Sequence, residues 1–270
     1  MTTLEARRAR VNALPLVGHQ VRYEMRAYLR NTRARIFTVA VPVVLLVLLV
    51  LLFGKNGSAS AGGQKLKIGE YYVPHIAAMA IVGSALVNLL ISVVAKRESG
   101  SLKRRRATPV PAWVLIAADA VTSIVSGLVV VAILVAIGSL GYGVHLSWPV
   151  IGVTLVVCII GSAAFCCLAY ALSTIVGSAD SAGPMTQFAT LPVYFISGIY
   201  IPDNVLPRWV LDVAGVLPVR PLAVALQAAF VPATNHGARF AVVPLLVVLA
   251  WGVAGLVIAV MRFSWAPRRS

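Results

Sequence analysis

Acidic residues are scarce in this sequence. It has 8 Asp and Glu against 23 Lys and Arg, and only 11% of its 270 residues carry a charge. Soluble domains usually have about a quarter charged residues. Since 60% of the residues are hydrophobic, polar side chains are too few to cover a water-exposed globule. This shortage excludes a soluble domain and predicts an integral membrane protein.

Other absences narrow the possible functions. The three cysteines, Cys158, Cys166 and Cys167, lack Cys-x-x-Cys or Cys/His spacing, so no metal site or disulfide framework is predicted. Gly54-Lys55 does not complete a phosphate-binding loop. Asp119 is the only acid well inside an apolar stretch, whereas an intramembrane enzyme needs converging His, Asp or Glu. We therefore predict that the chain is not an enzyme and has no metal or cofactor of its own.

Six apolar stretches approach the roughly 20 residues that a membrane-crossing helix needs. Helices are expected because lipid offers no partners for backbone polar groups. A seventh stretch, 210–231, is interrupted by Pro218, Arg220 and Pro221, and we expect short helices there at the outer interface. The fold class is therefore all-α integral membrane, with six spans at about 36–53, 72–95, 113–140, 149–176, 185–201 and 240–261.

Basic residues set the predicted orientation. Of the 23 Lys and Arg, 17 fall in segments 1–35, 96–112 and 262–270. Cytoplasmic flanks are rich in Lys and Arg, so both termini and the loop between spans two and three are expected inside. Because these charges flank apolar spans, anionic lipids and not nucleic acid are the expected counter-surface.

Residues 1–35 have a pattern of their own. Apolar and basic side chains recur at helical spacing on two different faces, which is typical of a helix lying in the inner interface or of a simple topology anchor. The apolar face has Val17, Val21, Met25 and Tyr28, and the basic face has Arg22, Arg26, Arg30 and Arg33. We therefore divide the chain into a cytoplasmic basic segment (1–35), a six-helix transmembrane domain (36–262) and a cytoplasmic basic tail (263–270).

The loop between spans two and three combines a short basic amphipathic helix with two stop signals. Gly100 allows a turn after span two, and Pro109 and Pro111 end any helix before span three. A topology signal needs only scattered Lys and Arg. The apolar anchor Leu102 in this basic turn favours docking onto another protein.

This loop resembles the coupling loop of ABC-2 type transporter permeases, Arg-Glu-x-Gly-Ser/Thr-Leu-x-Arg-x-x-x-Thr-Pro. The matching residues are Arg97, Glu98, Gly100, Ser101, Leu102, Arg104, Thr108 and Pro109. Arg105 stands where such permeases often have Leu. The segments 30–37, 196–202, 206–209 and 217–218 are similar to the entry of span one and to the outer segment of the same family.

The resemblance implies an ABC exporter permease in the bacterial inner membrane. ATP and Mg would be bound by a separate ATPase chain, and a second permease copy or a sister permease would complete the pathway.

Within the family, size and pattern are most similar to drug- and antibiotic-resistance exporters. Coupling to the ATPase would involve Arg97, Glu98, Gly100, Leu102, Arg104 and Thr108. A lipid or lipid-linked glycan is the alternative cargo, and a membrane-embedded enzyme, an assembly factor or a secondary transporter are the other classes considered.

Polar residues within the spans have two interpretations. The resemblance places spans two and five beside the pathway, where a large amphipathic cargo would meet polar and aromatic side chains. Hydrogen-bonded packing between helices is the alternative for the same residues. Asp119 is expected to pair with an inner-side Arg or a neighbouring hydroxyl, a proton or cation site being the other possibility. The candidate pathway residues are Asn88, Gln187, Thr190, Tyr194 and Phe195.

Overall fold

The computed structural model describes residues 13–54, 58–100, 112–144 and 147–262, and these form a helical bundle with one small β-hairpin. The hairpin, β1 (Ala59–Ala61) and β2 (Gln64–Leu66), was not predicted; it turns through Gly62 and Gly63, which both have positive φ. The helices are α2 (Ala13–Arg30), α3 (Thr32–Gly54), α4 (Ile68–Val82), α5 (Leu89–Glu98), α7 (Ala112–Gly141), α8 (Trp148–Ser173), α9 (Ala179–Ile196), α10 (Arg208–Val216), α11 (Val219–Phe230) and α12 (Val242–Arg262).

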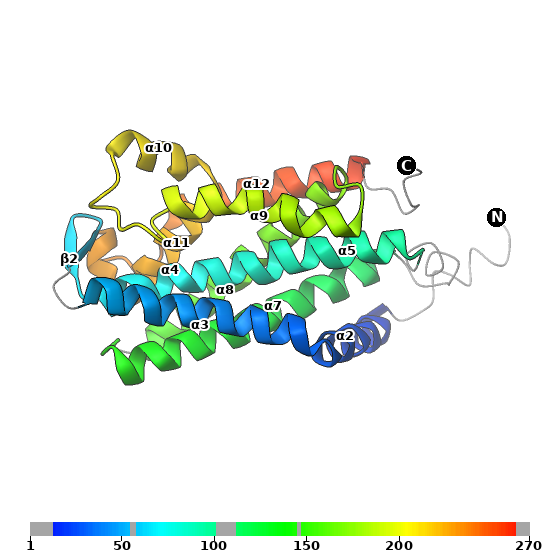
Figure 1. Cartoon of the computed structure of the whole chain (residues 1–270), viewed down its shortest axis with the longest axis horizontal. Coiled ribbons are helices and arrows are strands. Elements are labelled where there is room, and N and C mark those ends of the chain that lie inside the picture. Colours follow the sequence, from blue (N-terminus) through cyan, green and yellow to red (C-terminus); the bar gives the residue numbers. More distant parts are fainter. Residues whose placement is uncertain (1–12, 55–57, 101–111, 145–146, 263–270) are drawn as a thin grey trace, which may run out of the picture.

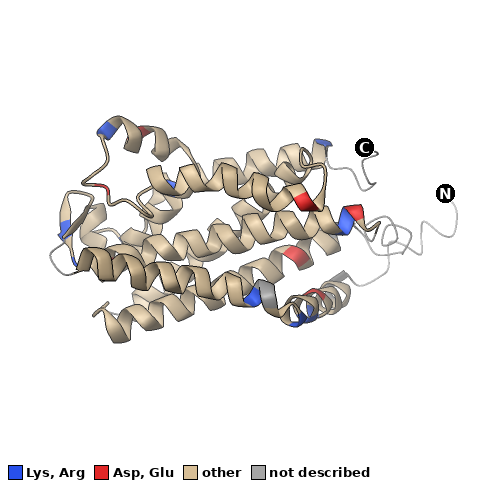
Figure 2. Cartoon of the chain, viewed as in Figure 1, with Lys and Arg blue, Asp and Glu red and all other residues tan. Residues whose placement is uncertain are grey.

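The long helices run between two ends of the bundle (Figure 1). One end carries α2 and the last turn of α12, and we call it the α2 end. The other carries the β-hairpin and α10, and we call it the hairpin end. Charged residues gather at these two ends and are nearly absent from the middle (Figure 2). This distribution leaves an apolar belt, as expected for a protein that crosses a membrane.

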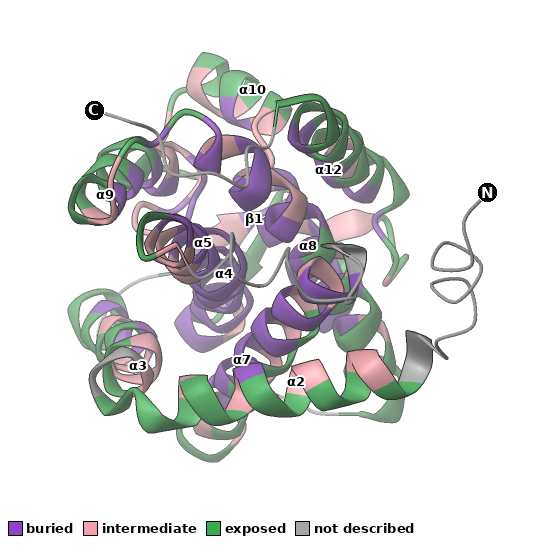
Figure 3. Ribbon diagram, turned by 90° about the vertical axis from the view of Figure 1, so that its right-hand side faces the viewer, coloured by how far each residue is buried: buried purple, intermediate pink, exposed green. Residues whose placement is uncertain are grey.

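Five helical segments are long and apolar enough to span a membrane: α3, the α4–α5 segment, α7, α8 and α12. The α4–α5 segment, Ile68–Glu98, is continuous through a π-helical stretch, η1 (Gly83–Asn88). It lies in the centre of the bundle, where burial is greatest (Figure 3). It begins four residues before the predicted start at residue 72, so Pro74 lies in its second turn rather than its first.

Helix α9 is the predicted fifth span, although it is too polar to be among those five. It starts six residues before the predicted residue 185 and ends five before 201. Its first residue contacts Glu98 at the α2 end, whereas Gly198, just beyond its last turn, contacts Tyr71 at the hairpin end. Since its two ends touch opposite ends of the α4–α5 segment, α9 runs the length of the bundle beside the five apolar segments.

Helices α10 and α11 form a bent pair, with 98° between them. At the bend, the carbonyl of Val216 accepts a hydrogen bond of 2.7 Å from Trp251 Nε1 on α12. Trp251 lies about 14 Å along α12 from Val242, at 1.5 Å per residue. The pair therefore enters from the hairpin end, turns at Leu217–Pro218 about halfway along α12, at the surface of the bundle, and returns, so residues 210–231 do not cross. This agrees with the expectation of short helices between spans five and six.

Small residues allow α8 and α12 to pack closely. A Cβ added at Gly252 would lie 2.8 Å from Ala164 Cβ, and one added at Gly255 would lie 2.9 Å from the backbone nitrogen of Leu168. Real Cβ atoms do not approach other atoms so closely, so the two backbones touch at these glycines. Such contacts are a main source of helix association in lipid.

Gly255→Ala is expected to destabilise the bundle by about 1–3 kcal/mol, because the added methyl forces α12 away from the α8 backbone. The measurement is the midpoint of thermal unfolding of the purified chain in detergent. Gly215→Ala on α10 is the matched control, since a Cβ there meets no atom within 4 Å. Equal midpoints for the two variants would contradict close α8–α12 packing.

Candidate functional site

Arg97, in the last turn of α5, binds the loop between α8 and α9. Its side chain is 2% exposed, Nη1 donates to the carbonyl of Ser173 at 2.7 Å, and Nη2 donates to the carbonyls of Val176 and Gly177. The last carbonyls of a helix have no partner within the helix and carry partial negative charge. The guanidinium therefore caps the C-terminus of α8.

The neighbouring Glu98 binds the other side of the same loop. One carboxylate oxygen accepts a hydrogen bond of 2.8 Å from the backbone N–H of Ala179, the first residue of α9. A carboxylate is favourable at a helix N-terminus, where N–H groups are unpaired. Arg97 and Glu98 thus hold the end of one helix and the start of the next. We call these two residues and the loop 174–178 the inner junction.

The segment that leaves the inner junction begins with a sharp turn. Gly100 has φ +67, a backbone conformation that favours glycine, as its sequence position suggested. Three further predicted coupling residues, Leu102, Arg104 and Thr108, lie outside the described residues. The predicted coupling segment therefore begins with two residues, Arg97 and Glu98, that are hydrogen-bonded to the end of α8 and to the start of α9.

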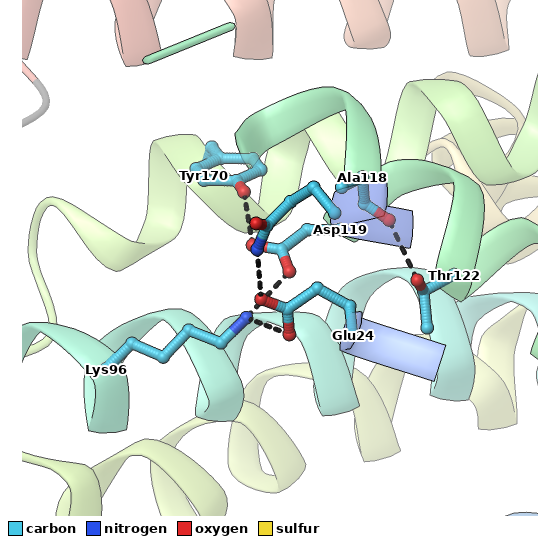
Figure 4. A network of polar contacts seen from close by, with 7 residues as sticks. Glu24, Lys96, Ala118, Asp119, Thr122 and Tyr170 are labelled. Carbon is cyan, nitrogen blue, oxygen red and sulfur yellow. Dashed lines mark hydrogen bonds and ion pairs between the residues drawn. The ribbon is translucent and has the colours of Figure 1, made fainter. Parts of the chain in front are cut away.

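A second polar cluster ties four helices together near the α2 end (Figure 4). The ammonium of Lys96 on α5 lies 2.8 Å from Oε2 of Glu24 on α2 and 2.7 Å from Oδ1 of Asp119 on α7. The hydroxyl of Tyr170 on α8 donates to Oδ2 of Asp119 at 2.9 Å. We call these four residues the inner polar cluster. Asp119 is therefore paired with a lysine and a hydroxyl, close to the pairing expected from the sequence, in which the cation was an Arg.

Glu24 was missed by the sequence analysis, although a signal was present. It lies three residues after Val21 and four before Tyr28, on the face that packs against α7, and it is the most buried of these three. An acid among apolar residues of an interfacial helix needs a cation within the protein. Arg22, Arg26 and Arg30 are exposed on the opposite face of α2, as its amphipathic pattern predicted.

The hairpin end holds a third network, which the sequence did not reveal. Arg220 on α11 makes two hydrogen bonds to Asp203, at 2.8 and 2.9 Å. The hydroxyl of Tyr71 on α4 donates to the carbonyl of Gly198 at 2.9 Å and accepts from the backbone N–H of Asp203 at 3.2 Å. His75 stacks on the Tyr71 ring, with centroids 4.1 Å apart. We call this the outer network; it joins span two, the end of α9 and the α10–α11 pair.

The five candidate pathway residues lie in different surroundings. Asn88 donates to the hydroxyl of Thr38 on α3 at 2.9 Å. On α9, Thr190 and Tyr194 are buried, whereas Gln187 and Phe195 are exposed on another face. Thr190 lines an apolar cavity of about 290 Å³ between α5, α8, α9, α12 and the tip of the α10–α11 pair. The single chain therefore does not bring these five residues to one surface.

These features together define the class of protein: a multi-pass helical membrane protein with an amphipathic N-terminal helix, a bent helical pair before the last span, and a basic loop after the α4–α5 segment. The sequence profile described as ABC-2 type transporter matches residues 17–231, which is most of the chain. The chain therefore belongs to the ABC-2 type transporter family and is a permease component of an ABC transporter. No curated protein matches the sequence closely enough for comparison.

Proposed function

We propose that this chain is the permease subunit of a bacterial ABC exporter that moves an amphipathic drug- or antibiotic-like cargo outward. ATP and Mg are bound by a separate ATPase chain, and a second permease, identical or homologous, completes the pathway. The family match over residues 17–231 carries the proposal, because that range includes the inner junction and the basic loop after it. The fold supports it: the wide apolar belt offers surface for a second permease.

The α2 end is assigned to the cytoplasm of the cell. The described part of that end includes Lys96, Arg97 and the exposed arginines of α2, and the cytoplasmic side of membrane proteins is rich in such residues. With the six crossings proposed from the sequence, both termini would be on this side. Segments 1–12 and 263–270, which belong to the proposed cytoplasmic flanks, lie outside the described residues.

Coupling is proposed to run through the inner junction. A displacement of the loop after Gly100 by the ATPase pulls on the end of α5, and Glu98 passes the displacement to the first turn of α9. Arg97 holds α8 to the same point, so the spans move together. In this scheme Leu102, Arg104 and Thr108 contact the ATPase, whereas Arg97 and Glu98 act within the permease.

Glu98→Gln is expected to lower cargo-stimulated ATPase activity and export about tenfold while the chain still inserts and folds. The amide keeps one acceptor oxygen but removes the charge that favours the α9 N-terminus, so the link weakens without a large loss of stability. The measurement is ATP hydrolysis and efflux by the complex co-expressed with its ATPase in vesicles.

The matched control is Glu70→Gln, which changes a carboxylate at the first turn of α4, at the hairpin end. It should leave stimulated ATPase activity unchanged. Wild-type coupling in Glu98→Gln would remove the inner junction from the mechanism. The cargo class is identified by measuring drug efflux and lipid flipping in the same vesicles. Lipid flipping without drug efflux would show that the cargo is a lipid and not a drug-like molecule.

A further inference from the structure

The apolar cavity beside α9 opens onto the apolar belt of the bundle. Its volume is about 290 Å³, and its lining includes both exposed and buried side chains. The exposed ones mark the opening and come from α9, from α12 and from the loop between α8 and α9; α9 and α12 stand on the two sides of α10 in Figure 3. The opening has Ile175, Met185 and Trp251, and the inner wall has Leu86 and Phe165. The cavity is therefore a recess that faces the membrane.

The lining favours hydrocarbon over a polar ligand. No charged side chain is among the described residues that line the cavity. The hydroxyls of Thr186 and Thr190 donate to carbonyls of their own helix at 2.6 and 2.9 Å, and Trp251 donates to Val216. Apolar cavities of about 150 Å³ already stay free of water and take up small hydrocarbons. A drug-like ligand usually requires a few well-placed polar groups, so a plain hydrocarbon chain suits this cavity better.

The depth of the cavity matches one leaflet of the membrane. Ile175 and Val176, in the loop of the inner junction, line its end nearest the α2 end, and Leu217, at the bend about halfway along α12, lines its other end. Along α9 the lining extends from Met185 to Val193, which is about 12 Å at 1.5 Å per residue. Half of the hydrocarbon core is about 15 Å thick. The cavity is therefore as long as most of a chain from a single leaflet.

We propose that this cavity binds one acyl chain of a phospholipid from the leaflet at the α2 end, which is the cytoplasmic leaflet in the proposed orientation. The carboxyl end of the chain lies beside Ile175, and its methyl end lies beside Leu217. Acyl chains surround the belt at this depth, and a chain inside the cavity gains the dispersion contacts that an empty cavity lacks. The proposal concerns this chain and the bilayer alone, so it does not depend on an ATPase, on cargo or on coupling.

The test is photolabelling of the purified full-length chain in phosphatidylcholine nanodiscs. One probe lipid carries a diazirine at the methyl end of an acyl chain, and a second carries it near the carboxyl end. Mass spectrometry of peptides locates the labelled residues. The first probe is expected to label Leu217 and Phe165, and the second is expected to label Ile175. Because Phe165 is 1% exposed, a chain that stays outside the cavity cannot reach it.

Two results would overturn the proposal. The first is labelling of outward-facing residues such as Val253, which is 60% exposed, without any labelling of Phe165. The cavity would then be left to a second permease copy or to cargo. The second is the reverse order of depth, in which the methyl-end probe labels Ile175 and the carboxyl-end probe labels Leu217.

A pair of variants locates the labelled site. Ala189→Trp introduces an indole into the lining from an exposed position on α9, and it should lower labelling of Phe165 at least about fivefold because the ring occupies the space of the chain. Ala250→Trp is the matched control, since Ala250 is exposed on α12 and lies outside the lining. Equal labelling of Phe165 in the two variants would refute the site. If either variant fails to fold, the depth order in the unmodified chain still decides the proposal.

Discussion

Arg97→Ala is expected to lower the unfolding midpoint of the chain by at least about 10 °C. The change leaves the carbonyls of Ser173 and Val176 buried without a donor, at about 1–3 kcal/mol for each. It also frees the end of α8 from α5. Thermal unfolding of the purified chain in detergent measures the effect, together with the yield of folded protein.

Two further variants define the cause. Arg97→Lys should recover only part of the loss, because one ammonium cannot reach carbonyls spread over three residues as a guanidinium does. Arg262→Ala, which removes an exposed arginine at the end of α12, should leave the midpoint within about 2 °C. A wild-type midpoint for Arg97→Ala would show that the inner junction does not hold the bundle together.

Arg220→Met is expected to destabilise the chain by about 3 kcal/mol. The methionine fills similar space but leaves the Asp203 carboxylate, which is 15% exposed, without its cation. Because Asp203 also contacts Tyr71, the loss should loosen the attachment of the α10–α11 pair to span two. The measurement is again the unfolding midpoint, with trypsin cleavage within residues 197–218 as a local readout.

The double variant Asp203→Asn with Arg220→Met should be more stable than Arg220→Met alone, because no unpaired charge remains. Arg208→Met is the control, since Arg208 is an exposed arginine at the same end of the bundle. If Arg208→Met and Arg220→Met had the same midpoint, the outer network would contribute nothing measurable to stability.

Local patterns predicted most of the fold correctly. The apolar stretches predicted the bounds of α3, α7, α8 and α12 to within a few residues. In lipid, the length and hydropathy of a stretch largely decide whether it forms a membrane-crossing helix. The interruption at Pro218 and Arg220 correctly argued against a seventh crossing. The start of α9 was misplaced, because its first turn carries the polar residues Asp180 and Ser181; the backbone of this turn is capped by Ser178 and Glu98.

The candidate site was only partly predictable. Arg97 and Glu98 were found through a family resemblance, but the sequence indicated a role toward another protein. In the structure both residues bind the loop between α8 and α9, which is about 80 residues away along the chain. A local sequence pattern cannot predict contacts between residues so far apart in the chain. The contacts of Glu24 with Lys96 and of Tyr71 with Asp203 could not be predicted for the same reason.

The sequence by itself determined that the chain is an all-helical, multi-pass membrane protein, because hydropathy acts on each segment separately as it meets lipid. Only the tertiary structure decided which polar side chains are paired, where the cavities lie and which residues hold the ends of α8 and α9. Those properties depend on distances between helices that are remote in sequence, and packing alone sets these distances.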